Sequence, residues 1–376
     1  MDPHRRGGGT GPAALGAILI GAVGATAGAY LLFSRPLPAA VTADTASAPP
    51  SLLTVGDDRL ETGDWSGAQE AFAQAAAADP SLVAAEVGLA RSLTYQYRFP
   101  EAIVHARRAV SIGPREAAAY TALAQALDWS GDLDGAGPAA RRAVDLDPKL
   151  PDAHATLAEV YADRYQLAPA QTEVDRALEL APEGIEPLRV RAYLLETQGQ
   201  YDEAAAAYVD ALAAAPRYAH LHLALGNVYR AQQRFSEALD EFRTAAQLAP
   251  ADARPIASIG LVYMQQDDYR DAIPYFEQAG ALDGEYATPP GQLGTAYYFL
   301  GDYAHAQEPL ARAVQLEKSP ARLGAYHHVL GWTYLRNGLL DQAEAEFQGA
   351  LAIDPNLSGA RDGLDAVGAQ RQSPRS

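Results

Sequence analysis

The chain has 376 residues, of which 48% are hydrophobic and 20% are charged, so a composition too polar to bury a core is excluded. It contains no cysteine, which excludes disulfide scaffolds, thiol nucleophiles and cysteine-ligated zinc or iron–sulfur sites. The formal net charge is −18, and because nucleic-acid binding requires clustered Lys and Arg side chains, we expect no nucleic-acid partner.

A basic, Gly-rich tail over residues 1–11 precedes an uncharged, apolar segment over residues 12–34. As a helix, the apolar run from 13 to 33 would be about 31 Å long, which matches the hydrocarbon core of a bilayer. A helix with no polar face needs apolar surroundings on every side, and we therefore predict a transmembrane helix or uncleaved signal anchor. The small residues before position 44 leave open the alternative that residues 1–43 are a cleaved signal peptide.

The charges that flank this segment predict its orientation. Arg5 and Arg6 precede it and the single Arg35 follows it, so the positive-inside rule places the N-terminus in the cytoplasm. The rest of the chain is then expected on the extracytoplasmic side of the cell membrane, attached by a single span. Residues 35–50 are rich in Pro and Ala and lack periodicity, which predicts an extended linker.

From residue 51 onwards the sequence repeats with a period of 34 residues. The ends of six successive units are marked by Pro80, Pro114, Pro148, Pro182, Pro216 and Pro250. A strict period of this size predicts a helical repeat array rather than one compact core. Counted from these stops, nine units start near residues 49, 83, 117, 151, 185, 219, 253, 287 and 324.

Every unit has the same pattern of small and large residues. Counted from the start of a unit, positions 20 and 27 are Ala in all nine units, as at Ala68 and Ala75 of the first. Position 8 is Gly or Ala, position 11 is mostly large, and position 24 is often aromatic. Two alanines seven residues apart share one helix face and allow a neighbouring helix to approach closely. Turns such as Gly63-Asp64-Trp65 predict a left-handed glycine at the end of the first helix.

This pattern resembles that of the tetratricopeptide repeat (TPR) family. The resemblance implies an all-α fold, a right-handed α-solenoid of about nine helix–turn–helix units over residues 51–355. The tail after Pro355 has its apolar residues on one side, which predicts a capping helix over residues 356–368 and a frayed tail over 369–376. Unit eight departs from the pattern, with Lys318 at the Pro position and three extra residues before unit nine.

The resemblance also implies a concave groove lined by the first helix of each unit. The candidate groove residues are Tyr95, Trp129, Tyr193, Asn227, Arg230, Tyr298, Trp332 and Arg336. Aromatic side chains surrounded by polar ones suit the capture of an extended or helical peptide. The alternative is that several of these aromatic residues pack between units and that the charges form a solvated face.

No motif for a P-loop, a nucleophile elbow or a zinc protease is present, and we expect no enzyme activity, no cofactor and no metal site. His220, His222, His327 and His328 are interpreted as structural. The predicted function is a membrane-anchored module or scaffold that binds a protein or peptide partner. The alternatives are an exported soluble binding protein after signal cleavage and a non-catalytic subunit of an enzyme or envelope complex. Self-association as a homo-oligomer through Gly24 and Gly28 or the terminal units is a further option.

Overall fold

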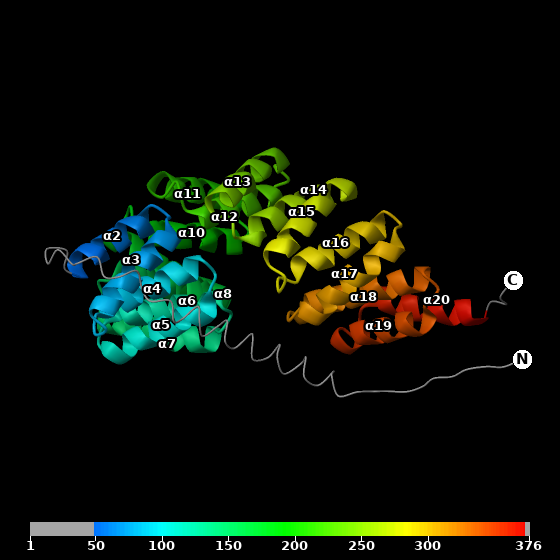
Figure 1. Ribbon diagram of the computed structural model, residues 1–376, viewed down its shortest axis with the longest axis horizontal. Helices are drawn as coiled ribbons and strands as arrows, with labels where there is room; N and C mark the ends of the chain where they lie inside the picture. The colour runs from blue at the N-terminus through cyan, green and yellow to red at the C-terminus, as the bar shows by residue number, and fades with distance from the viewer. Residues whose placement is uncertain (1–48, 373–376) are drawn as a thin grey trace, which may run out of the picture. The chain divides into compact units, whose positions relative to one another are not determined.

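The computed structural model describes residues 49–372, and every element in this range is a helix (Figure 1). Nine helix pairs follow one another and a single helix ends the array. The first helices of the pairs, from repeat 1 to repeat 9, are α2 (Pro49–Glu61), α4 (Val83–Tyr95), α6 (Ala117–Trp129), α8 (Pro151–Asp163), α10 (Ile185–Thr197), α12 (Ala219–Ala231), α14 (Ala253–Gln265), α16 (Thr288–Phe299) and α18 (Pro320–Arg336). The second helices are α3 (Trp65–Ala78), α5 (Phe99–Ile112), α7 (Leu133–Leu146), α9 (Leu167–Leu180), α11 (Tyr201–Ala214), α13 (Phe235–Leu248), α15 (Tyr269–Leu282), α17 (Tyr303–Leu316) and α19 (Leu340–Ile353). The final helix is α20 (Ser358–Gln372).

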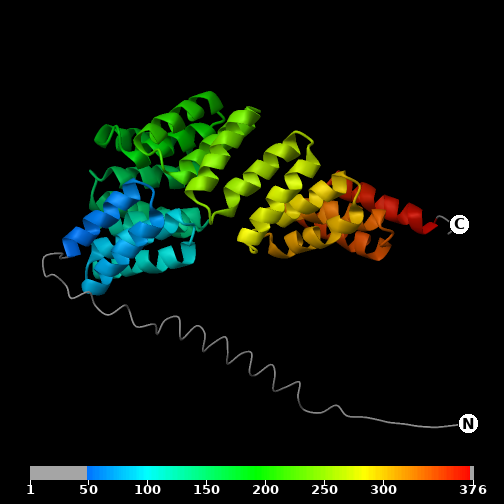
Figure 2. The same ribbon diagram turned by 45° about the horizontal axis from the view of Figure 1, so that its top comes forward.

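The packing between pairs makes the array an α-solenoid. Each first helix packs against the second helix of its own repeat and against the second helix of the preceding repeat. First helices also contact the first helices of neighbouring repeats, whereas second helices pack mainly on the first helices that flank them. The first helices therefore lie on the inner side of the curved array, as Figures 1 and 2 show, and the predicted all-α repeat fold is confirmed.

Small residues at position 8 make room for large residues at position 24. Phe242 of α13 and Phe276 of α15 are fully buried, and each lies over a glycine of the first helix in its own repeat. A Cβ atom added at Gly226 would lie 2.6 Å from Phe242, and one added at Gly260 would lie 2.7 Å from Phe276. Because core atoms are already in contact, position 8 tolerates no larger side chain in these repeats.

The turn between the two helices of each repeat contains one residue in the left-handed conformation. Five repeats have glycine there, as the sequence predicts: Gly63, Gly131, Gly199, Gly301 and Gly338. The other four repeats have a residue with a side chain at the equivalent position, and these are Tyr97, Tyr165, Gln233 and Asp267. A side chain in this conformation is strained, because its Cβ crowds the backbone.

Histidine–glutamate pairs connect the two helices of three repeats at the same repeat positions. The Nδ1 atoms of His154, His222 and His327 each lie 2.6 Å from a glutamate oxygen of the second helix. Burial lowers the pKa of His222, but hydrogen bonds to Glu241 and to the Pro216 carbonyl outweigh burial and raise it. These contacts agree with the structural role predicted for His222 and His327.

Several predicted boundaries differ from the observed helices. Pro49 and Pro50, assigned to the linker, form the start of α2, because proline is tolerated in the first turn of a helix. The extra residues before unit nine lengthen α18 rather than a loop, so α18 has 17 residues. Helix α20 runs to Gln372, so residues 369–372 extend the predicted capping helix and are not a frayed tail.

The predicted tail (1–11) and membrane segment (12–34) lie outside the described residues, as does the linker before Pro49. None of the helices within residues 49–372 combines the length and the apolar composition that a membrane span requires.

Candidate functional site

On the inner face, side chains of repeats 1 and 2 contact repeats 5 and 6. The Tyr95 ring stacks on Trp65 at 4.5 Å and on His220 at 5.2 Å between centroids. Its hydroxyl donates a hydrogen bond to Glu186, which lies 91 residues later in the chain. Trp65 also meets Tyr218 edge to face at 4.6 Å. The array therefore closes on itself here, and Figure 2 shows α2 and α3 beside α10 and α12.

A buried network of charges lies next to this aromatic cluster. Arg189 donates to Glu159 at 2.7 Å and to Glu186 at 2.9 Å, and all three side chains are buried. Burial alone would raise the pKa of Glu186, but Arg189 and the Tyr95 hydroxyl outweigh it and lower the pKa to about 2. Glu186 is therefore ionised, and the two buried carboxylates share the Arg189 guanidinium.

Two other groups near this network are neutral at pH 7. Asp128 is 3% exposed and neither carboxylate oxygen has a hydrogen-bond partner. Burial, together with the charge of Glu159, raises the pKa of Asp128 to about 9. The ring nitrogens of His220 also have no partner, and burial together with Arg189 lowers the pKa of His220 to about 3. Because Asp128 and His220 are both neutral, they add no further charge inside the closed region.

Two predicted groove residues belong to this closed region. Tyr95 is 3% exposed, so it does not line an open groove, and the packing alternative holds for it. Trp129 is half-buried, its Nε1 donates to Glu159 at 3.1 Å, and the Arg189 guanidinium lies over its ring at 5.1 Å. The aromatic side chains were predicted to bind a partner, but here they bind repeats of the same chain.

Three other predicted groove residues meet in an open pocket of about 510 Å³ on the inner face of repeats 4 to 6, called here the central pocket. Tyr193 extends from α10, and Asn227 and Arg230 extend from α12. The pocket is lined by Ala162, Asp163, Tyr165, Tyr193, Glu196, Thr197, Tyr201, Asn227, Arg230 and Ala231.

Both carboxylates of the central pocket accept hydrogen bonds from tyrosines, whereas one guanidinium nitrogen of its arginine has no hydrogen-bond partner. Asp163 accepts a hydrogen bond from Tyr193, and Glu196 accepts one from Tyr208 at 2.8 Å. Burial lowers the pKa of Arg230, opposed by the charge of Glu196, and its Nε has no hydrogen-bond partner. Arg230 is thus a partly desolvated cation that can bind an additional anionic group.

Tyr165 was not predicted as a site residue. Its side chain is 81% exposed at the central pocket, and its backbone φ is 55°. The signal was present in the sequence, because Tyr165 occupies the turn position that is glycine in five other repeats. A bulky, exposed side chain in a strained conformation is a feature that clusters at functional sites.

The remaining predicted groove residues lie in repeats 8 and 9 and do not line the central pocket. Burial raises the pKa of Tyr298, and the charge and hydrogen bond of Arg336 oppose this rise, so these two side chains are neighbours. Arg336 is exposed. Trp332 donates to His328 Nε2 at 3.0 Å and packs edge to face on Phe347 at 5.5 Å, which indicates a packing role within repeat 9.

Nine helix pairs with a continuous inner surface define an α-helical repeat protein. Models of the tetratricopeptide repeat family match residues 53–114, 87–151, 189–253, 292–358 and 256–285. These ranges cover more than half of the sequence, and the chain belongs to the tetratricopeptide repeat family. No curated protein matches the sequence.

Solved structures share the fold. A chain in the crystal structure of the APC/C hetero-tetramer Cut9-Hcn1 matches with 19% identity and a TM-score of 0.68, over 86% of this chain and 63% of that one. The present chain thus spans less than two thirds of that protein. YrrB, described as a TPR protein with an unusual peptide-binding site, matches with 22% identity and a TM-score of 0.40, over 51% of this chain and 97% of that one. Because 444 chains match, the fold alone does not select one function.

Proposed function

We propose that this protein is a non-catalytic interaction scaffold that binds a peptide segment of a partner protein in the central pocket. The observation that carries the proposal is the convergence of Tyr193, Asn227 and Arg230 with the strained, exposed Tyr165 in one open pocket. Three of these four residues were expected in the groove from the resemblance to the tetratricopeptide repeat family.

Each of these side chains suits one feature of a peptide. The Asn227 amide carries both donors and an acceptor and can hydrogen-bond the backbone of an extended peptide. The Arg230 guanidinium can pair with a carboxylate of the peptide. The neighbouring Glu196 already accepts a hydrogen bond from Tyr208, so it does not use all the donors of Arg230. The exposed Tyr165 and Tyr201 rings offer apolar contact at the rim.

The proposal can be tested with a phage-displayed library of random peptides about 12 residues long, selected on the purified full chain. The enriched peptides are then measured by fluorescence polarisation. Asn227→Ala and Arg230→Ala should each weaken binding roughly tenfold, or about 1.4 kcal/mol. Arg270→Ala is the matched control, because Arg270 is exposed on the second helix α15 and does not line the pocket. Peptides that bind both pocket variants as tightly as the unmodified chain would refute the central pocket as the site.

We also propose that residues 12–34 anchor the array to the cell membrane, with the array on the extracytoplasmic side. The support is the uncharged apolar run and the arginines that precede it. Expression with a C-terminal tag, fractionation, and protease treatment of spheroplasts test this. A membrane-bound, full-length product digested from outside is expected. A soluble product shortened near Ala43 would instead support the exported binding protein, and protection from protease would overturn the topology.

A further inference from the structure

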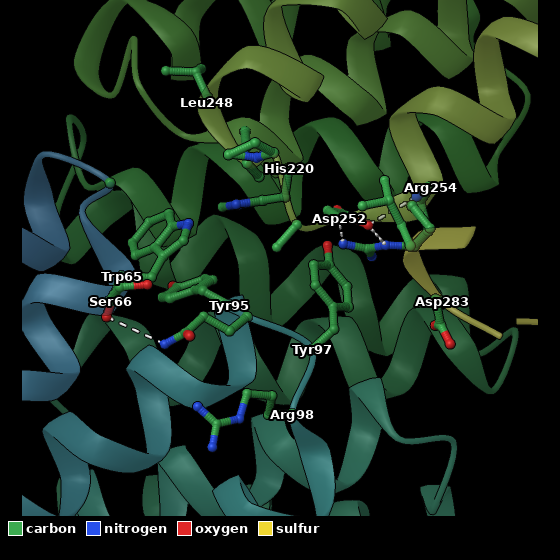
Figure 3. A pocket seen from close by; sticks show the side chains of 18 of the residues that line it. Trp65, Ser66, Tyr95, Tyr97, Arg98, His220, Leu248, Asp252, Arg254 and Asp283 are labelled. Carbon is green, nitrogen blue, oxygen red and sulfur yellow. Dashed lines mark hydrogen bonds and ion pairs between the residues drawn. The ribbon is translucent and has the colours of Figure 1, made fainter. Parts of the chain in front are cut away.

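The largest pocket described in the array, about 760 Å³, lies between the turns of repeats 1 and 2 and the loops that precede α12, α14 and α16 (Figure 3). Three aspartates and three arginines line it, so its charge favours neither an anion nor a cation. Its Tyr97 ring is covered by Trp129, at 5.8 Å between centroids, and by the Arg254 guanidinium, which stands beside it in Figure 3. The inner face of repeats 1 to 5 differs, because its charge is not balanced.

Two small pockets on the first helices form one continuous groove, called here the acidic groove. Their volumes are about 180 Å³ and about 120 Å³, and both are lined by Val87, Arg91 and Ala118. The first pocket lies between α2, α4 and the start of α6, and the second extends over α6 and α8 to Glu186 of α10. The acidic groove shares no lining residue with the central pocket.

The acidic groove has a surplus of negative charge. Four carboxylates line it: Asp57, Glu116, Asp152 and Glu186. Its lining holds one basic residue, Arg91, whose Nη2 atom lies 3.6 Å from an Asp152 oxygen. Glu186 shares Arg189 with Glu159. Asp57 and Glu116 are exposed, and no ion pair of either occurs in the part of the chain that the structure describes. A cation that enters this groove is therefore attracted.

The pKa values of two groove carboxylates agree with this surplus. Burial raises the pKa of Asp57 and of Asp152, and the positive charge of Arg91, which opposes the rise, does not cancel it. A second cation next to these side chains would favour their ionised forms.

Two buried polar side chains supply a second, independent observation. Thr156 of α8 is 5% exposed, Gln125 of α6 is 4% exposed, and both line the 120 Å³ pocket. The Gln125 amide nitrogen donates to Glu186 at 3.4 Å, but its carbonyl oxygen accepts no hydrogen bond from residues 49–372. The Thr156 hydroxyl has no hydrogen-bond partner in this range either. Because buried polar groups are normally hydrogen-bonded, these two oxygens indicate a ligand that donates hydrogen bonds.

The surface between the charges is made by small side chains. Ala84 and Ala118 are exposed, and Val87 is partly exposed. Small residues allow an extended backbone to approach closely, and the aliphatic stems of Lys and Arg pack on such a surface while their charged ends reach carboxylates.

We propose that the acidic groove is a second binding site of the array, which takes a segment of a partner protein with two positively charged side chains. One of these side chains enters the 120 Å³ pocket, where it pairs with Asp152 and donates to the two unpaired oxygens. The other pairs with Asp57 and Glu116 at the exposed end of the groove. This inference does not rest on peptide binding in the central pocket.

The test uses the full chain and two fluorescein-labelled, amidated octapeptides, one of alternating alanine and arginine and one of alternating alanine and glutamate. Fluorescence polarisation at about 0.15 M salt measures their affinities. We expect saturable binding of the arginine peptide, weakened by added salt, and no binding of the glutamate peptide.

Asp57→Asn combined with Glu116→Gln should weaken binding of the arginine peptide roughly tenfold. The matched control is Asp145→Asn combined with Glu203→Gln, which changes the net charge equally on the exposed second-helix residues of α7 and α11. The control should change the affinity less than about twofold, because neither residue lines the groove.

Thr156→Val separates a bound hydrogen-bond donor from simple attraction between charges. The arginine peptide should bind this variant roughly fivefold more weakly, while the thermal unfolding midpoint does not fall, because the hydroxyl has no partner in the free protein. Equal affinities of the two peptides, binding of neither, an equal loss in the control, or unchanged affinity in either groove variant would each overturn the proposal. Asn227→Ala in the central pocket should leave arginine-peptide binding unchanged, so the two sites are tested separately.

Discussion

At the scale of single residues, a missing Cβ atom decides how closely the two helices of a repeat approach. Gly226 and Gly260 lie directly beneath buried phenylalanines, whereas repeats 2 to 4, which have Ala or Val at position 24, have alanine at position 8. Ala90 and Ala106 of repeat 2 are an example, and both are completely buried. The two positions are therefore matched in volume in these repeats, whereas repeat 5 combines Ala192 with the large Tyr208.

Gly260→Val should destabilise the array by roughly 1–3 kcal/mol, because its Cβ would lie 2.7 Å from the Phe276 ring, which is fully buried and has no room to move. Urea denaturation measures the effect. Gly280→Ala in α15 is the control, since a Cβ there meets its nearest neighbour at 3.7 Å, and it should stabilise by about 0.5–1 kcal/mol. Equal midpoints for the two variants would contradict this packing account.

Tyr165→Gly should stabilise the chain by roughly 1 kcal/mol and at the same time weaken peptide binding. The turn needs a left-handed residue, and the 81% exposed Tyr165 side chain contributes little to packing. Gln233→Gly relieves the same strain at an exposed position that does not line the central pocket. It should therefore stabilise without changing peptide affinity. Thermal midpoints measure the stability of both variants, and fluorescence polarisation titrations measure their peptide affinity. An unchanged affinity for Tyr165→Gly would show that this tyrosine is not part of the site.

Asp128→Asn should stabilise the protein, and more so at high pH. The pKa of Asp128 is raised from 3.8 to about 9 on folding, so between these values the unfolded chain releases a proton that the folded chain retains. The stability of the unmodified protein therefore falls as pH rises through this window, by roughly 1 kcal/mol per pH unit, and asparagine does not titrate. Urea midpoints at about pH 5 and about pH 8 measure the difference. A gain that is the same at both pH values would show that Asp128 is ionised in the folded state.

At the scale of helices, the repeat pattern specifies which segments are helical because every unit repeats the same small and large positions. Errors occur at the ends, where the repeat pattern stops. Pro49 and Pro50 suggested a linker by composition, yet they begin α2, and residues 369–372 continue α20. Helix ends depend on local contacts such as the packing of Val367 against the last repeat, which the period does not encode.

Helix α20 should be required for the stability of repeat 9. Gly363 and Val367 cover Phe347, which is completely buried, and a chain ending at Asn356 would expose this ring to water. Hydrogen exchange in α18 and α19 should accelerate in the truncated chain, while exchange in repeats 1 to 6 remains as before. Unchanged protection of α19 would show that the last repeat does not need its cap.

At the scale of the whole array, the contact of repeats 1 and 2 with repeats 5 to 7 could not be predicted from the sequence. A repeat pattern specifies contacts between neighbours, whereas Tyr95 meets Glu186 only because small rotations between repeats accumulate along the array. By contrast, Tyr193, Asn227 and Arg230 lie on the adjacent first helices α10 and α12, so the repeat positions that assign them to one groove also bring them close together. Tyr95 and Trp129 were assigned to the same groove, but both rings lie against His220 of the distant repeat 6.

The central claim is that a partner peptide binds the inner face at repeats 4 to 6, where the array is open. Hydrogen exchange of the full chain, with and without a peptide selected on it, tests this claim most directly. We predict slowed exchange at the Tyr165 turn and along α10 and α12. Protection confined to the second helices α9, α11 and α13, with no change at the Tyr165 turn, would place the partner on the outer face and contradict the account.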